Sequence, residues 1–306
     1  MVKRNARVTR LQVIRTQGRE CAQSARPQSR SLAVVSGKGG VGKTTLVANL
    51  AVALQRKGQK VLVVDGDLGM ADLDLHLGMI PRHTLYDIVL GERTAQEVLV
   101  RTPDGINFLP GASGVPEMAD LDDLRCERLL RSVSEVEDGM DLILFDTAPG
   151  IHRTTLHLAR AADDIVIVTT PEPTSLIDAY ACFRVLVSKK LRAQPWIVVN
   201  QAQTAREAKD AASRIRDTAR RFLTCEPRFL GWILDDATVP TAIRKQEPLL
   251  RACPGSAAAR CFEILARNWM ESLTPDPEGT ALPRGMDEAG TISNQPEIPT
   301  RGLLQA

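Results

Sequence analysis

The fold of this chain is decided by the stretch Gly37-Lys38-Gly39-Gly40-Val41-Gly42-Lys43-Thr44. An apolar run at residues 32–35 precedes it, and an apolar segment with helical spacing, residues 46–54, follows it. A glycine-rich loop between a strand and a helix turns backbone N–H groups inward around phosphate oxygens, and the helix N-terminus adds its positive dipole end. The sequence therefore predicts a P-loop that binds the phosphates of a nucleotide.

The residue types in this loop predict individual roles. In a P-loop, the lysine after the last glycine holds the β- and γ-phosphates and the hydroxyl that follows it ligates Mg²⁺. We assign these roles to Lys43 and Thr44, and expect ATP or ADP with Mg²⁺ as ligands. The loop residues predicted to bind the nucleotide are Gly37, Lys38, Gly39, Gly40, Val41, Gly42, Lys43, Thr44 and Thr45.

Carboxylates follow two further apolar runs. Asp65 and Asp67 come after residues 61–64, and Asp146 comes after residues 142–145. A P-loop needs such oxygens at the ends of neighbouring strands to position Mg²⁺ and water. We predict that Asp146 is the Walker B-type acid that supports Mg²⁺ through water, and that Gly150 donates its backbone N–H to the γ-phosphate. Strand-end aspartates also form turns, so this interpretation depends on the P-loop beside them.

Continuous apolar runs alternate with segments of helix length along residues 31–273. Strands without polar alternation are covered on both faces, so the pattern predicts an α/β fold with a doubly wound, mostly parallel sheet and helices on both faces. The expected strands contain residues 32–35, 61–64, 106–109, 142–145, 165–168, 196–199 and 229–233. The expected helices lie near residues 44–56, 122–136, 154–161, 175–191, 206–222 and 256–273.

The two ends of the chain differ in composition from the middle. Residues 1–30 carry eight Lys or Arg and one acid, Glu20, and are predicted to form a flexible basic arm. Residues 31–273 form the predicted ATPase domain. Residues 274–306 contain nine Pro or Gly and are predicted to be a disordered tail. The formal net charge of the 306 residues is only +2, which gives the whole chain no strong attraction to nucleic acid.

The six cysteines form no CxxC pair and no Cys/His cluster with metal spacing. They indicate reduced thiols, as in a cytoplasmic protein. No apolar run approaches the roughly 18–20 residues that a membrane span needs, and the start of the chain lacks the hydrophobic stretch of a signal peptide. We therefore expect a cytoplasmic protein that is neither exported nor integral to a membrane.

A second lysine, Lys38, directly follows the first glycine of the loop. The resulting pattern, Lys-Gly-Gly-Val-Gly-Lys-Thr, resembles the deviant Walker A group of ATPases, the MinD/ParA superfamily. The resemblance implies that Lys38 reaches across a nucleotide-sandwich homodimer to the phosphates of the partner. It also implies a slow Mg²⁺-dependent ATPase in which Lys38, Lys43 and Asp67 are the catalytic residues.

Further stretches, at residues 65–74, 109–115, 146–151 and 171–180, resemble the FlhG family of flagellar-number regulators, also called FleN or YlxH. This resemblance extends over residues 31–273. It implies that Asp67 orients the attacking water, that Asp65 is a Mg²⁺ partner and that Asn200 contacts adenine. The same resemblance places Asp235 and Asp236 near the base.

The family resemblance also implies partners. These are the flagellar GTPase FlhF, proteins of the flagellar switch complex, or a flagellar transcription activator. The GTPase-activating motif of the family is degenerate here at residues 5–11. The amphipathic segment 258–273 can be a peripheral membrane anchor at the inner face of the membrane or a helix packed on the core, and we favour packing because its polar face is not rich in lysine.

Two related functions stay open as alternatives. A ParA-type partition ATPase would bind DNA through basic residues such as Arg244, Lys245 and Arg251, which the MinD-like stretches disfavour. A MinD-type division-site regulator is the other alternative. Iron–sulfur carriers of the superfamily are excluded by the lack of a CxxC pair, and tyrosine kinases by the lack of any tyrosine in the tail.

Overall fold

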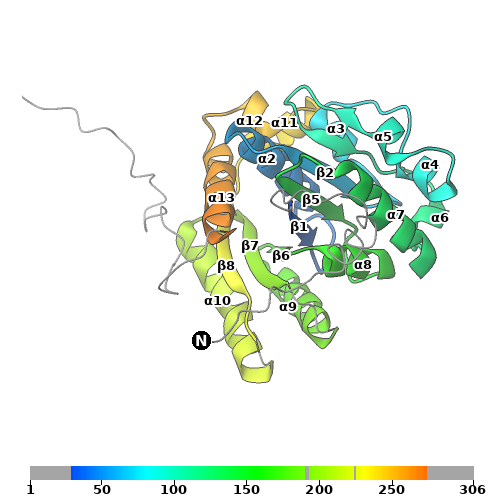
Figure 1. Cartoon of the computed structure of the whole chain (residues 1–306). Coiled ribbons are helices and arrows are strands. Elements are labelled where there is room, and N and C mark those ends of the chain that lie inside the picture. The colour runs from blue at the N-terminus through cyan, green and yellow to red at the C-terminus, as the bar shows by residue number, and fades with distance from the viewer. Residues whose placement is uncertain (1–28, 190–192, 224, 274–306) are drawn as a thin grey trace, which may run out of the picture.

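The protein is built around one eight-stranded sheet (Figure 1), and the computed structural model describes residues 29–189, 193–223 and 225–273. The predicted tail, and the arm apart from its last two residues, lie outside the described residues. The strand order is β3-β4-β2-β5-β1-β6-β7-β8, and all neighbours are parallel except β3 and β4. The strands are β1 (Arg30–Val35), β2 (Val61–Gly66), β3 (Val100–Arg101), β4 (Asn107–Leu109), β5 (Leu142–Thr147), β6 (Asp164–Thr169), β7 (Gln194–Ala202) and β8 (Arg228–Leu234).

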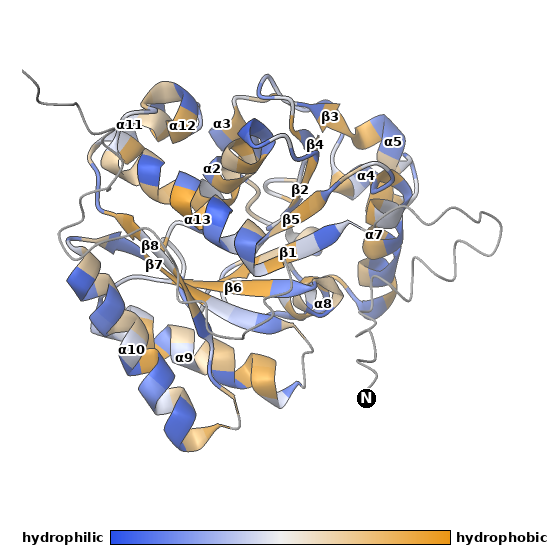
Figure 2. Cartoon of the chain, turned by 60° about the vertical axis from the view of Figure 1, so that its left-hand side comes forward, coloured by the Kyte–Doolittle hydropathy of each residue, from blue (hydrophilic) through white to orange (hydrophobic). Residues whose placement is uncertain are grey.

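Helices cover both faces of this sheet (Figure 2). One face is covered by α2, α3 and α11 to α13, and the other by α4 to α10. This arrangement is the predicted doubly wound α/β fold. The helices are α2 (Lys43–Arg56), α3 (Leu73–Leu77), α4 (Leu85–Leu90), α5 (Ala95–Val98), α6 (Pro116–Ala119), α7 (Asp123–Val136), α8 (Arg153–Ala161), α9 (Pro173–Ser188), α10 (Ala205–Phe222), α11 (Thr238–Arg244), α12 (Leu249–Ala252) and α13 (Ala257–Leu273).

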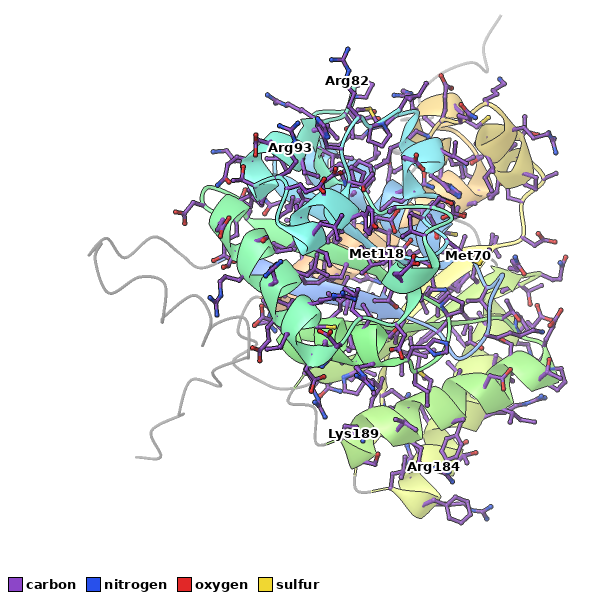
Figure 3. The ribbon with its side chains drawn as sticks, turned by 90° about the vertical axis from the view of Figure 1, so that its right-hand side faces the viewer. Met70, Arg82, Arg93, Met118, Arg184 and Lys189 are labelled. Carbon is purple, nitrogen blue, oxygen red and sulfur yellow. The ribbon has the colours of Figure 1, made fainter. Side chains whose placement is uncertain are left out.

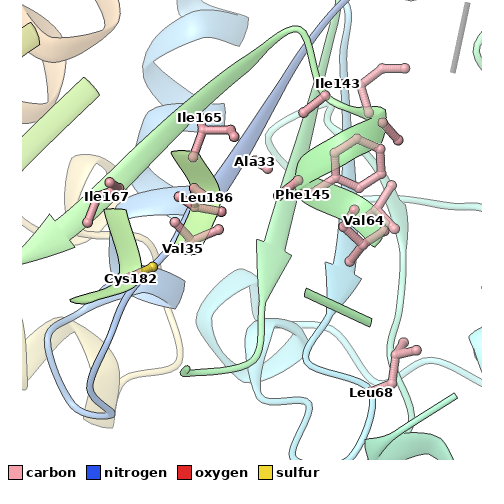
Figure 4. Packing of buried hydrophobic residues seen from close by; sticks show 14 of the residues in the cluster. Ala33, Val35, Val64, Leu68, Ile143, Phe145, Ile165, Ile167, Cys182 and Leu186 are labelled. Carbon is pink, nitrogen blue, oxygen red and sulfur yellow. The ribbon is translucent and has the colours of Figure 1, made fainter. Parts of the chain in front are cut away.

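The buried strands explain the two-sided core. All six residues of β2, of β5 and of β6 are buried. Alternate residues of a strand point to opposite faces, so Ala33 and Val35 of β1 join one apolar cluster while Leu32 and Val34 join the other. Figure 4 shows the first cluster, where side chains of β1, β2, β5 and β6 lie together with Cys182 and Leu186 of α9.

All seven predicted strands and all six predicted helices are present, with ends shifted by a few residues. The expected helix 175–191, for example, begins at Pro173 and ends at Ser188. The elements that were not predicted are the two-residue strand β3 and the short helices α3 to α6, α11 and α12. Segments of two to seven residues are too short to show a reliable periodicity, so composition alone does not reveal them.

The topology creates the site at the carboxyl edge of the sheet. After β1 the chain builds β2, β4 and β5 on one side of β1, and then β6, β7 and β8 on the other. The chain therefore reverses its direction of winding at β1, and open α/β sheets bind ligands in the crevice outside such a switch point. The glycine-rich loop directly follows β1 and lies at this crevice.

Helix α13 packs on the core. Phe262, Leu265 and Trp269 are fully buried, and the helix lies against α2 and β8. This confirms packing as the reason for the apolar stripe at residues 258–273. The indole Nε1 of Trp269 donates to Asp164 Oδ2 at 3.3 Å, and Arg30 at the start of β1 binds both oxygens of the same carboxylate, at 2.9 and 3.2 Å. Along the described chain, no helix combines the length and apolar character needed to cross a membrane.

Candidate nucleotide-binding site

The P-loop ends at the first turn of α2. Gly40 and Gly42 have φ angles of 77° and 88°, a region that favours glycine, and Gly42 is the N-cap of the helix. No side chain caps α2, and its first turn contains no acid. The N–H groups at this helix end therefore lack a local side-chain acceptor, which is the arrangement that binds phosphate. Lys43, the first residue of α2, is buried at this position, as its predicted role requires.

Close contacts hold the loop against α9 and β7. A Cβ atom at Gly37 would collide with the backbone carbonyl of Asp178 in α9, and one at Gly42 would collide with the side-chain amide of Asn200. Asn200 donates from Nδ2 to the Val41 carbonyl at 2.8 Å and is itself buried. The residue predicted to contact adenine therefore lies at the P-loop, where it also supports the loop backbone.

Asp65 and Asp146 lie side by side at the carboxyl ends of β2 and β5, in register with each other. Each residue is only 1% exposed. Asp65 Oδ1 accepts the backbone N–H of Asp67 at 3.2 Å, whereas Asp65 Oδ2 and both Asp146 oxygens have no hydrogen-bond partner. Thr44 lies close enough to influence Asp146, although the two side chains do not meet the geometry of a hydrogen bond. Buried, unpartnered carboxylate oxygens beside a threonine hydroxyl suit Mg²⁺, which prefers oxygen ligands.

Burial determines the protonation of these acids. Burial raises the pKa of Asp146 to about 7, against the opposing effect of the Lys43 ammonium. Burial, and then the charge of Asp146, raise the pKa of Asp65 well above its ordinary value. Burial also raises the pKa of Asp67, and Lys43 again opposes the shift. Burial therefore opposes ionisation of these carboxyls when no cation is bound, and Mg²⁺ would favour their ionised forms.

The described residues contain no group of three or more His, Cys, Asp or Glu side chains that could hold a metal ion. A Mg²⁺ ion would therefore be held by Thr44, by Asp146 and Asp65 directly or through water, and by phosphate oxygens of the nucleotide. Such an arrangement would couple metal binding to nucleotide binding. Thr44, Asp65 and Asp146 would orient the ion, which would supply positive charge next to the phosphates.

Lys38 is held within its own chain. Its Nζ donates to Glu172 Oε2 at 3.2 Å and lies 3.5 Å from Thr174 Oγ1, and the side chains of Lys38 and Glu172 are 44% and 66% exposed. Ser36 Oγ donates to the Lys38 carbonyl at 2.8 Å and so holds the loop backbone at this position. Glu172 and Thr174 were not predicted as site residues. The only sequence signal for them is that both lie in the stretch 171–180, which carries part of the family resemblance.

Three predicted residues have other contacts in this structure. The Gly150 N–H donates to the Ser36 carbonyl at 2.8 Å, so a contact with the γ-phosphate would require this bond to break. Asp235 Oδ2 accepts from Gln203 Nε2 at 3.0 Å. Asp236 accepts from Thr238 and from the backbone N–H of Ala258, so it binds the first turns of α11 and α13. These contacts give Asp236 a structural role.

Asp72 is an acid that the sequence analysis did not assign to the site. It is exposed at the start of α3, and its charge contributes to the raised pKa values of Asp65, Asp67 and Asp146. The clustering of acids within residues 65–74 was the available signal. The carboxyl edge therefore concentrates negative charge opposite Lys43, which favours a divalent cation.

Comparison with known proteins identifies the family. A sequence family described as an AAA domain matches residues 29–188. The antiactivator FleN of Pseudomonas aeruginosa is 34% identical over 236 residues, which cover 77% of this chain and 84% of FleN. This chain belongs to the FlhG/FleN branch of the MinD/ParA superfamily.

Two other proteins agree with this assignment, YlxH with the FlhG/FleN branch and MinD with the superfamily and its fold. The flagellum site-determining protein YlxH of Helicobacter pylori is 31% identical over 241 residues, which cover 78% of this chain and 81% of YlxH. The structure of the septum site-determining protein MinD of Pyrococcus horikoshii with Mg-ADP has a TM-score of 0.65 and 27% identity, and covers 80% of this chain and 98% of that protein. The comparisons thus establish that this chain has the FlhG-type fold with its P-loop and belongs to a family of ATPases.

The alternative of ParA-type DNA binding depends on Arg244, Lys245 and Arg251, and in this FlhG-type chain one of these cations is already paired with acids. Arg251 Nη1 binds Asp104 at 3.1 Å, and its Nε lies 3.9 Å from Glu247. Arg244 and Lys245 are exposed at the end of α11. Two exposed cations are a small basis for binding a polyanion, so the structure does not favour a ParA-type DNA surface at this place.

Proposed function

We propose that this protein is a switch that dimerises with ATP and regulates the number or placement of flagella. Its similarity to FleN and YlxH supports the flagellar process. The observation that carries the switch mechanism is the position of Lys38. This second lysine lies exposed at the nucleotide edge, on a loop whose other lysine, Lys43, is buried beside the phosphate position.

The cis contact of Lys38 is weak enough to be exchanged. An ion pair between two exposed side chains contributes about 0–1 kcal/mol, because both groups are well solvated. The phosphates of a nucleotide on a second chain carry more charge than Glu172 and offer several acceptor oxygens. Lys38 can therefore leave Glu172 and bind the nucleotide of the partner when two ATP-loaded chains meet.

Apolar side chains around the same edge favour this encounter. Met70, Ile151 and Ile177 are exposed, and they lie in the segments that follow β2, β5 and β6 (Figure 3 labels Met70). Single exposed apolar residues are common, but three at the mouth of one site form a surface that gains from burial. Face-to-face dimerisation at the carboxyl edge would cover them.

Hydrolysis then serves as a timer. Asp67, which is half-buried beside the metal acids, orients the attacking water, and Lys38 of the partner neutralises charge at the phosphates. Hydrolysis is slow because this arrangement is complete only across the dimer interface. The release of phosphate removes the contact of Lys38 and returns the protein to the monomer.

The output of the switch is binding to flagellar partners. We propose the SRP-type GTPase FlhF, proteins of the flagellar switch complex or a flagellar transcription activator as partners that distinguish the dimer from the monomer. The protein would act in the cytoplasm, with access to the inner face of the membrane. The degenerate segment 5–11 makes GTPase activation the least supported of these outputs.

Molar mass in solution tests the switch. Wild type should be a monomer with ADP and a dimer with ATP and Mg²⁺, and Asp67→Ala should remain a dimer because it binds ATP without hydrolysing it. Lys38→Ala is the matched control, since it should still bind ATP and stay monomeric. If ATP leaves the mass of wild type and of Asp67→Ala unchanged, the dimer mechanism is wrong.

A further inference from the structure

The C-terminal ends of α9 and α10 lie together at the edge of the sheet opposite the P-loop. Both helices return from the carboxyl ends of adjacent strands, β6 and β7, and pack side by side on one face (Figures 1 and 2). Near these two ends lies a group of exposed residues that we call the basic tip. The basic tip consists of Arg184, Lys189, Arg220, Arg221 and Phe222.

The basic tip has an excess of positive charge. Arg220 binds Asp217 at 3.1 Å and Glu226 at 2.8 Å, and Arg216 binds the same glutamate at 3.2 Å. Asp217 and Glu226 are therefore already paired with these two arginines. Within the described part of the chain, the other three cations of the tip have no acidic partner, and Figure 3 shows two of them, Arg184 and Lys189, at the end of α9. A protein with a net charge of +2 thus concentrates positive charge at one place.

An exposed aromatic side chain directly follows two of these arginines in the sequence. Phe222 is the last residue of α10 and is 72% exposed. Cations at the C-terminal end of a helix interact favourably with its dipole. This effect can explain Lys189, Arg220 and Arg221 without any binding partner. The dipole gives no reason for an exposed phenylalanine, which loses the hydrophobic gain of burial. Phe222 therefore points to a partner with an apolar layer.

We propose that the basic tip binds the surface of an anionic phospholipid membrane. The cations would contact the lipid headgroups, and Phe222 would enter the boundary between headgroups and acyl chains. Duplex DNA offers the same negative charge, but it accepts an aromatic ring only where a base step is unstacked, which costs a few kcal/mol. The contact is separate from α13, whose apolar face is buried in the core.

The position of the basic tip predicts how binding relates to the nucleotide. The tip lies at the amino edge of the sheet, whereas the P-loop and the proposed dimer surface lie at the carboxyl edge. Lipid binding should therefore take place with ADP and with ATP alike. It would keep the protein near the membrane in both states without competing with dimerisation.

Cosedimentation with vesicles tests this proposal. Wild type should sediment with vesicles of phosphatidylcholine and phosphatidylglycerol, less at high salt, and not with phosphatidylcholine alone. Each cation near an anionic surface contributes about fivefold to the partition coefficient, so Arg184→Gln/Lys189→Gln/Arg221→Gln should lower it on the order of 100-fold. Phe222→Ser should lower it about tenfold.

Matched controls lie on another surface of the same domain. Arg244→Gln/Lys245→Gln removes exposed charge from α11, and Ile80→Ser removes an apolar side chain that is 96% exposed. Both controls should bind vesicles as wild type does, and all variants should keep the thermal stability and ATP affinity of wild type. The proposal is wrong if wild type does not bind the anionic vesicles, or if the controls lose binding as strongly as the tip variants. Salt-sensitive retention of duplex DNA by the tip, without vesicle binding, would assign this surface to nucleic acid and also overturn the proposal.

Discussion

Replacing Asp146 with asparagine should stabilise the protein when it holds neither nucleotide nor metal. The carboxylate is 1% exposed and neither of its oxygens has a hydrogen-bond partner, and burial raises its pKa from the ordinary 3.8 to about 7. Each pKa unit corresponds to about 1.4 kcal/mol, so forcing this group to ionise in the folded state costs about 4 kcal/mol above pH 7. An asparagine amide carries no charge at any of these pH values, so the substitution Asp146→Asn avoids this cost.

The sign of the pH dependence follows from linkage. Between about pH 4 and pH 7 the folded state binds more protons than the unfolded state, so the free energy of unfolding of wild type falls as pH rises through this window. Below pH 4 both states are protonated, and the two proteins should converge. The gain at pH 8 is on the order of 4 kcal/mol, and a neutral residue 146 adds to it because it removes the charge that helps to raise the pKa of Asp65.

Urea denaturation at pH 5 and pH 8, in the presence of a chelator, measures this difference. Wild type should lose stability from pH 5 to pH 8, and Asp146→Asn should lose much less. Addition of Mg²⁺ and ADP should reverse the order, because the metal stabilises only a protein that retains its carboxylate. Equal pH dependence in the two proteins, or a less stable variant at pH 8, would show that Asp146 is not held at the raised pKa.

Three further substitutions give expected outcomes. Gly37→Ala should lower the free energy of unfolding by about 2 kcal/mol and weaken ATP binding, because its Cβ collides with the Asp178 carbonyl; thermal unfolding and nucleotide titration measure both effects. Glu172→Gln should strengthen ATP-dependent dimerisation about two- to fivefold in sedimentation equilibrium, because it frees Lys38, and unchanged dimerisation would contradict the exchange mechanism. Asp164→Ala should cost about 2–3 kcal/mol in urea denaturation, because it leaves a buried indole N–H without an acceptor, and a cost close to zero would exclude that hydrogen bond.

The positions of Asp65 and Asp146, the acids predicted to hold Mg²⁺, could be inferred from the sequence because parallel strands impose them. The carboxyl ends of parallel strands meet at one edge of the sheet, so a P-loop after β1 and acids after β2 and β5 must converge. The apolar runs that defined these strands are continuous and buried, which makes them easy to recognise. The prediction of the site therefore depended on the topology and not on any side-chain detail.

Contacts between loops could not be predicted in the same way. The pair of Lys38 with Glu172 depends on how the start of α9 lies over the P-loop, and no periodicity encodes that arrangement. Gly150 was expected to face phosphate, but its N–H can equally bond to a neighbouring strand end, as it does with Ser36. Asp236 was placed by analogy near the base, whereas the helices that follow it supply N–H donors closer by.

The carboxylate of Asp164 joins the two limits of the folded domain. Arg30 binds it from the first residue of β1, and Trp269 binds it from the last turns of α13. The described chain thus begins and ends on the same side of the molecule, away from the nucleotide. A donor and an acceptor dye attached within the domain, close to Arg30 and to Trp269, would start from neighbouring points and leave the catalytic edge uncovered. Energy transfer between them within one chain should stay high through the ATP cycle as long as the domain is folded, so a fall in that signal would report unfolding of the domain.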